Sequence, residues 1–227
     1  MSHQQNLTRI KVVHASLEEL ADEVVFVGGA TVSLYADRAF TEARPTDDVD
    51  ILVEIFSHKD YAVIEEKLRA KGFENDIVSG VICRYVVKGI IVDVMPVSGK
   101  VLGFTNKWYT AAYGAAQHIK IDENVMVKIF DPVYFLAVKM EAYKSRGGND
   151  GRTSTDFEDI IFILNKRNTI WEELNVASNA VKKYLKESFR KWLKEKYLEE
   201  WISCHVDFEE QKRVNIITGG LMAFTQS

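Results

Sequence analysis

The stretch from Phe26 to Glu54 reads FVGGATVSLYADRAFTEARPTDDVDILVE. It begins inside a short apolar run, Val24 to Val27, which predicts a strand. Gly28 and Gly29 follow at the end of that strand, where residues without side chains let backbone N–H groups come close to a phosphate. The next residues, Ala30 to Phe40, predict a helix whose first turn adds partial positive charge.

A second strand is predicted at Val49 to Ile55, which is rich in Val and Ile. Asp48 and Asp50 stand two residues apart at its start, so their side chains point to the same face of the strand. A third acid, Asp93, lies within Ile90 to Val94, an apolar run that we expect to be buried on both sides. A carboxylate in such a run is costly unless it has a partner.

Three carboxylates on adjacent strands create an electrostatic problem. Two of them about 4 Å apart repel by roughly 4 kcal/mol at an effective dielectric constant near 20. The group therefore calls for a protonated member, basic partners or a divalent cation. All-oxygen ligands suit Mg²⁺, which leaves room for substrate phosphates, and two such ions can hold the attacking and leaving oxygens of a phosphoryl displacement. Among these three possibilities, we expect the cation: a site for two Mg²⁺ ions, with Mn²⁺ as the alternative, at Asp48, Asp50 and Asp93.

The rest of the chain separates into a mixed half and a helical half. Up to residue 130 we predict a helix at His58 to Lys71, a hairpin of Val81 to Val87 with Ile90 to Val94, and a hairpin of His118 to Ile121 with Val125 to Phe130. Beyond it we predict helices at Val133 to Ser145, at Thr155 to Arg167 and on to about Met222, with a polar loop at Arg146 to Arg152. The expected fold is α/β (α+β): a mixed sheet flanked by helices in residues 1–130, followed by a helical region in residues 131–227.

Composition narrows the function classes. The 227 residues are 47% hydrophobic and 27% charged, with a net charge of −4, which excludes a disordered tail and a strongly basic nucleic-acid coat. Cys83 and Cys204 are far apart, so neither a disulfide framework nor a structural zinc site is expected. Without an apolar run of about 18 residues, we expect a soluble cytoplasmic protein with no membrane partner.

The order of these motifs carries a resemblance. Gly-Gly, then Asp-x-Asp, then a third Asp on a later strand resembles the nucleotidyltransferase superfamily of DNA polymerase β, and the wider pattern is similar to AbiEii/AbiGii-type nucleotidyltransferase toxins. The matching segments are FVGGATVSLY, RPTDDVDILVE, GVICRY, IIVDVMP, LGFTNKWY and PVYFLAVKMEAYKSRGGNDGRTSTDFEDI, within roughly residues 24 to 165. Here 18 residues separate Gly29 from Asp48, more than is usual in the superfamily, and residues 37–43 lengthen the loop.

The resemblance implies a nucleotidyltransferase fold and roles for individual residues. Asp48 and Asp50 would hold metal, and Asp93 would be a ligand and general base. Gly28 and Gly29 would contact the phosphates. Thr31 stands near the superfamily's hydroxyl position, with a helix N-cap as the alternative.

The helical half supplies further candidates, and it would complete the active-site cleft. Lys139 and Arg146 share one helix face. The resemblance implies that Lys139 is a catalytic residue that contacts the nucleotide phosphates, and we expect Arg146 to bind the nucleotide as well. The alternatives are a surface lysine whose stem is buried and an arginine that complements the helix C-terminus. Asp156 and Asp159 are three residues apart on the next helix, where the resemblance places nucleotide-binding acids; for Asp156 the alternative is an acidic first turn.

The expected function is therefore Mg²⁺-dependent transfer of a nucleoside monophosphate from an NTP to an acceptor hydroxyl. The toxin-like relatives imply an RNA end or a protein as acceptor, and an antitoxin protein as partner. Two alternatives stay open at this point: a non-catalytic module that binds NTP or a partner, and a small-molecule nucleotidyltransferase of the antibiotic-modifying kind.

Overall fold

The computed structural model describes residues 2–37, 43–55, 57–99, 101–103, 106–146 and 150–227. It divides the chain into two compact units. The first unit comprises Met1–Leu34 and Glu42–Asp131, and the second comprises Tyr35–Thr41 and Pro132–Ser227. The division after Asp131 follows the change from mixed to helical sequence patterns. The sequence pattern does not indicate that Tyr35–Thr41 goes with the helical unit.

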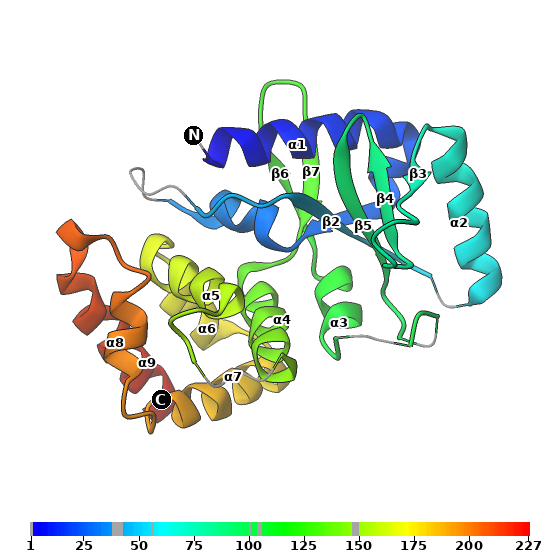
Figure 1. The fold of residues 1–227 in the computed structure, drawn as a ribbon. Helices are drawn as coiled ribbons and strands as arrows, with labels where there is room; N and C mark the ends of the chain where they lie inside the picture. Colours follow the sequence, from blue (N-terminus) through cyan, green and yellow to red (C-terminus); the bar gives the residue numbers. More distant parts are fainter. Residues whose placement is uncertain (1, 38–42, 56, 100, 104–105, 147–149) are drawn as a thin grey trace. The chain divides into compact units, whose positions relative to one another are not determined.

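The first unit is built on a mixed sheet of seven strands, in the order β3-β4-β5-β2-β1-β7-β6 (Figure 1). The strands are β1 (Val24–Val27), β2 (Asp48–Val53), β3 (Glu74–Asn75), β4 (Arg84–Val87), β5 (Ile90–Pro96), β6 (Gln117–Lys120) and β7 (Met126–Ile129). β2 runs antiparallel to β1 and parallel to β5, so the three central strands bring together segments that are far apart in the sequence.

Helices cover both faces of this sheet. They are α1 (Ser2–Leu17), α2 (His58–Ala70) and α3 (Tyr109–Gly114), with the 3-10 helices η1 (Glu18–Glu23) and η2 (Gly29–Tyr35). α1 packs on β2 and β5 through buried apolar residues that include Ile10, Val13 and Leu17. α3 lies on the other side of the sheet from α1 (Figure 1). Its Tyr109 hydroxyl lies 3.6 Å from the Met95 sulfur of β5.

Three local expectations are wrong. The helix predicted at Ala30 to Phe40 is a 3-10 helix that ends at Tyr35, and residues 38–42 lie outside the described residues. The strand predicted from Val81 begins only at Arg84. β5 is not buried on both sides: its buried residues alternate with partly exposed ones, and Asp93 is among the latter. The alternation arises because one face of β5 is buried beneath α1, whereas the opposite face, which carries Asp93 and Met95, is only partly covered.

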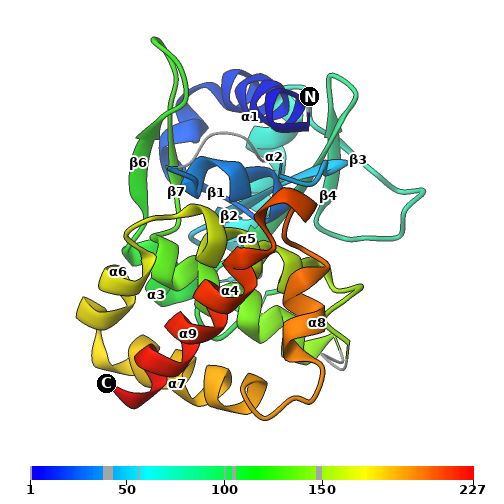
Figure 2. The ribbon, with the colours of Figure 1, turned by 90° about the vertical axis from the view of Figure 1, so that its left-hand side faces the viewer.

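The second unit consists of helices. They are α4 (Pro132–Ser145), α5 (Thr155–Lys166), α6 (Ile170–Val176), α7 (Asn179–Trp192), α8 (Leu198–Ser203), η3 (Phe208–Glu210) and α9 (Lys212–Gln226). α4 and α5 pack against each other, and α9 packs against α5, α6, α7 and α8 (Figure 2). The Ser154 side chain caps α5 by accepting a hydrogen bond from the Phe157 N–H. Of the predicted loop 146–152, residues 147–149 lie outside the described residues.

Among the helices that the structure describes, none combines the length and the apolar character needed to cross a bilayer.

Candidate active site on the sheet

Asp48 and Asp50 occupy the start of β2 and point to the same side of the sheet. Val49 and Ile51, which alternate with them, are fully buried on the other side. Both aspartates are partly exposed, as the two-residue spacing predicts for a polar row at the end of a half-buried strand.

Asp93 lies directly opposite Asp50 in the parallel pair of β2 and β5. Paired positions on neighbouring strands have their side chains on the same face, so Asp93 shares the face of Asp50 and Asp48. On the other side of β2, Asp50 pairs with Val27, the last residue of β1. This register places the acidic row next to the Gly28–Gly29 turn.

The turn itself is in contact with the acidic row. Gly28 has φ +71°, a left-handed conformation that favours glycine. A Cβ atom at Gly28 would also lie 1.8 Å from the Oδ2 atom of Asp50. Both the backbone conformation and this clash therefore exclude a side chain at position 28. The structure thus places the glycine pair and the second aspartate side by side.

Gly29 has a different neighbour, which the sequence reasoning missed. A Cβ atom at Gly29 would lie 2.5 Å from the Nη2 atom of Arg44. The segment that carries Arg44 is held by α1, because the buried Asn6 amide donates to the Arg44 carbonyl (3.3 Å) and its oxygen accepts from the Thr46 N–H (3.4 Å). The signal was available, since Arg44 stands four residues before Asp48 in the quoted motif.

Thr31 is fully buried beneath the turn. Its hydroxyl donates a hydrogen bond to the Gly28 carbonyl, with 3.0 Å between the oxygens. An N-cap side chain would accept a hydrogen bond instead, so Thr31 secures the turn by donation rather than by capping a helix.

Arg84 is the second residue that the sequence reasoning missed. It lies opposite Asp93 in the antiparallel pair of β4 and β5, and its guanidinium donates to both carboxylate oxygens, Nε to Oδ1 and Nη2 to Oδ2, at 2.8 Å each. The same Nη2 atom lies 3.6 Å from the Oδ2 atom of Asp48. The sequence does contain an indication of this role, because Arg84 is a charged residue between Cys83 and Tyr85, which are both buried in the fold.

These charges shift the titration of their neighbours. Hydrogen bonding to Asp93 raises the pKa of the Arg84 guanidinium above its already high usual value. Burial raises the pKa of the Cys83 thiol to about 11, and the negative charge of Asp93 adds to the increase. Arg84 therefore stays charged at any pH at which the protein is folded.

The donor set can be tested against Mg²⁺. Asp48 and Asp50 offer carboxylate oxygens on one face of one strand, which is the chemistry that this ion prefers. As the side chains stand, however, the described residues contain no group of three His, Cys, Asp or Glu placed to hold a metal ion. The bidentate pair with Arg84 engages both oxygens of Asp93. Asp48 and Asp50 thus offer the type of ligand that the ion prefers, while Arg84 binds Asp93 through two hydrogen bonds and lies 3.6 Å from Asp48.

The candidates of the second unit gather in a cluster between α4 and α5. The Lys139 ammonium is buried, 2.6 Å from Asp159 Oδ2 and 3.4 Å from Asp156 Oδ1. Arg146 lies 2.9 Å from the other oxygen of Asp156. Burial rules out the surface-lysine alternative for Lys139. Of these four side chains, the Arg146 side chain is the one that reaches solvent, at 71% exposure.

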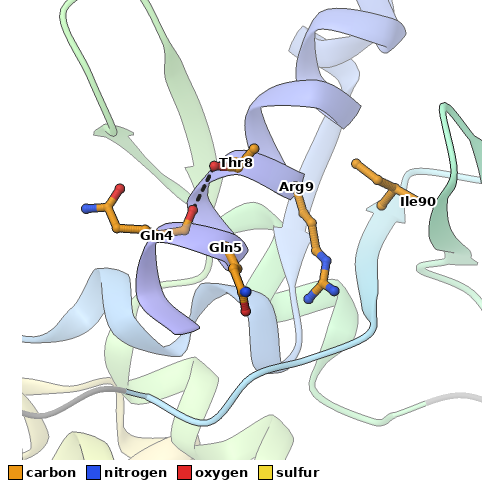
Figure 3. Close-up of a pocket in the computed structure, with 5 residues that line it drawn as sticks. All are labelled: Gln4, Gln5, Thr8, Arg9 and Ile90. Atoms are coloured by element: carbon orange, nitrogen blue, oxygen red, sulfur yellow. Dashed lines mark hydrogen bonds between the residues drawn. The ribbon is translucent and has the colours of Figure 1, made fainter. Parts of the chain in front are cut away.

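A hollow of about 620 Å³ lies elsewhere on the first unit. Figure 3 shows its lining residues, four from the first half of α1 and one from β5: Gln4, Gln5, Thr8, Arg9 and Ile90. Ile90 and Asp93 are three residues apart in one strand, so they face opposite sides of the sheet. The hollow is therefore not part of the acidic site.

Comparison with models of known protein families and with curated proteins finds no match for this sequence.

Proposed function

We propose that this protein is a Mg²⁺-dependent nucleotidyltransferase that moves a nucleoside monophosphate from an NTP to an acceptor hydroxyl and releases pyrophosphate. The observation that carries the proposal is the placement of three carboxylates on one sheet face beside a glycine turn. Asp50 is opposite Asp93, Asp48 is two residues before Asp50, and Gly28 touches Asp50. The proposed fold is that of the nucleotidyltransferase superfamily.

Each residue of this face has a role in the proposed reaction. A divalent cation, held by Asp48 and Asp50, would supply charge neutralisation for the triphosphate. The backbone of Gly28 and Gly29 would approach the phosphates. A carboxylate oxygen of Asp93 would accept the proton of the acceptor hydroxyl while the new bond to the α-phosphorus forms and the bond to the pyrophosphate oxygen breaks.

A positive group near these residues supports binding of an anionic substrate. Arg44 lies against Gly29 and carries a planar guanidinium suited to phosphate. In the second unit, Asp156 and Asp159 compensate the buried Lys139, so we assign a structural role to this buried trio. Arg146 pairs with the other oxygen of Asp156 but is 71% exposed, and we propose it as the phosphate-binding residue of that unit. An RNA end or a protein as acceptor, a toxin role and an antitoxin partner rest on the family resemblance alone.

The proposal is tested by transfer of label from α-³²P NTPs, each incubated with the protein, Mg²⁺ and total cell extract. Asp48→Asn and Asp50→Asn should abolish transfer into RNA, protein or small molecules while leaving the thermal midpoint nearly unchanged. Asp47→Asn is the matched control, because this exposed neighbour lies just before β2 and should retain activity. Undiminished transfer by the Asp48 and Asp50 variants would refute the site.

One observation favours a second candidate, a non-catalytic module that binds NTP. Arg84 occupies both oxygens of the carboxylate that would act as general base. Product analysis after incubation with Mg²⁺ and NTP separates the two functions: nucleotide binding without release of pyrophosphate supports the module.

A further inference from the structure

We propose that Arg84 is a resident cation that competes with the metal for Asp93, so that loading of the site requires Arg84 to release this carboxylate. The inference rests on the proposed function and adds a control element to the same site. Arg84 is thereby a positioning residue, which acts through Asp93 rather than on substrate.

The backbone builds this competition into the sheet. Arg84 and Asp93 are directly paired across β4 and β5, so their side chains leave the same face at neighbouring positions. The two parallel hydrogen bonds of 2.8 Å form the bidentate geometry that guanidinium and carboxylate groups favour. The side chains are 24% and 13% exposed, so water screens the pair only partly.

The charges of Arg84 and of the metal ion also favour competition for Asp93. Arg84 offsets the negative charge of Asp93, the carboxylate that the metal would also use. An ion that also used Asp93 would come close to the guanidinium, and the two cations would repel each other. Binding of a metal ion that also uses Asp93 therefore weakens the hydrogen bonds between Arg84 and Asp93.

The direct measurement is the affinity for Mn²⁺ in the absence of nucleotide. Binding is monitored through the electron paramagnetic resonance signal of the Mn²⁺ that stays free in solution. Arg84→Gln removes the competing charge and should bind Mn²⁺ roughly tenfold more tightly than the wild type. Arg69→Gln is the matched control, since it removes a largely exposed arginine from the same unit and should leave the affinity unchanged. In an Asp93→Asn background, the effect of Arg84→Gln should be smaller, because the hydrogen-bonded pair is lost and only the longer ion pair of Arg84 with Asp48 remains.

The outcomes separate this inference from the proposed function. If wild type and Asp50→Asn bind Mn²⁺ equally, the metal site itself fails, and with it the proposed function. If Asp50→Asn abolishes binding but Arg84→Gln binds no more tightly than the wild type, the competition is refuted while the metal site stands. Should Arg84→Gln fail to fold, Arg84→Lys tests the same point, because it keeps the charge but loses the bidentate grip and should bind Mn²⁺ more tightly than the wild type.

Discussion

Position 28 requires glycine for two independent reasons. Its φ of +71° is a conformation in which a Cβ atom meets the backbone, and the space beside it is filled by the Asp50 carboxylate. The first reason could be anticipated from a strand that runs into Gly-Gly. The second depends on the pairing of β1 with β2. Gly28 thus both allows the turn to form and leaves room for the Asp50 carboxylate.

We predict that Gly28→Ala destabilises the protein by about 2 kcal/mol or more and displaces Asp50. Gly89→Ala is the matched control: Gly89 has φ +77°, but a Cβ atom there would have no neighbour within 4 Å, so the substitution should cost only about 1 kcal/mol. Urea unfolding gives both values, and nucleotide transfer should fall for Gly28→Ala alone. Equal losses of stability would show that the contact with Asp50 contributes nothing.

At the scale of elements, local patterns predicted most of the strands and helices of the described chain. The hairpin of β4 and β5 forms at Lys88 and Gly89, where both residues have positive φ, as a two-residue turn requires. The N-terminal helix α1 was not predicted, although Ile10, Val13 and Leu17 recur at helical spacing. The first residues of α1 are polar, so the helical spacing of these apolar residues begins only in the second half of the helix.

The packing of α4 on α5 encloses an ion pair, and this leads to a prediction for Lys139. Lys139→Met leaves Asp156 and Asp159 buried without their ammonium partner, which should cost about 3–5 kcal/mol. Urea unfolding measures the loss. Lys71→Met is the matched control, because Lys71 also contacts two carboxylates at 2.8 Å, but those of Glu18 and Glu19 are exposed.

We expect the Lys71 variant to shift the unfolding midpoint only slightly, since exposed ion pairs contribute little. A Lys139 variant as stable as the Lys71 variant would mean that the buried carboxylates take up protons at little cost, and the structural role assigned to the trio would be wrong.

At the scale of the whole molecule, a short segment of the first half belongs to the helical unit. The Tyr35 ring lies 4.8 Å from that of Phe135, and the Asp37 N–H donates to the Lys166 carbonyl at the end of α5. The Arg167 side chain donates to the Tyr35 carbonyl. The helical unit is thus completed by residues that precede it by about a hundred positions.

We predict that Tyr35→Ala loosens the helical unit and not the sheet. Loss of a fully buried aromatic side chain should cost about 3–5 kcal/mol, and hydrogen exchange should accelerate at the amides of α4 and α5. Tyr61→Ala is the counterpart in the first unit, where it should affect α2 and the adjacent strands instead. Faster exchange in β2 and β5 of the Tyr35 variant would contradict the assignment of this segment.

The sequence by itself determined which residues lie in most of the strands and helices, and that Asp48 and Asp50 share a face, because alternation along a strand is a local property. It also singled out Asp93 as a carboxylate in need of a partner. Only the tertiary structure decided that the partner is Arg84 and that Asp50 touches Gly28. Both contacts depend on strand register, and register is set by the packing of whole elements, whose pairing a local pattern does not specify.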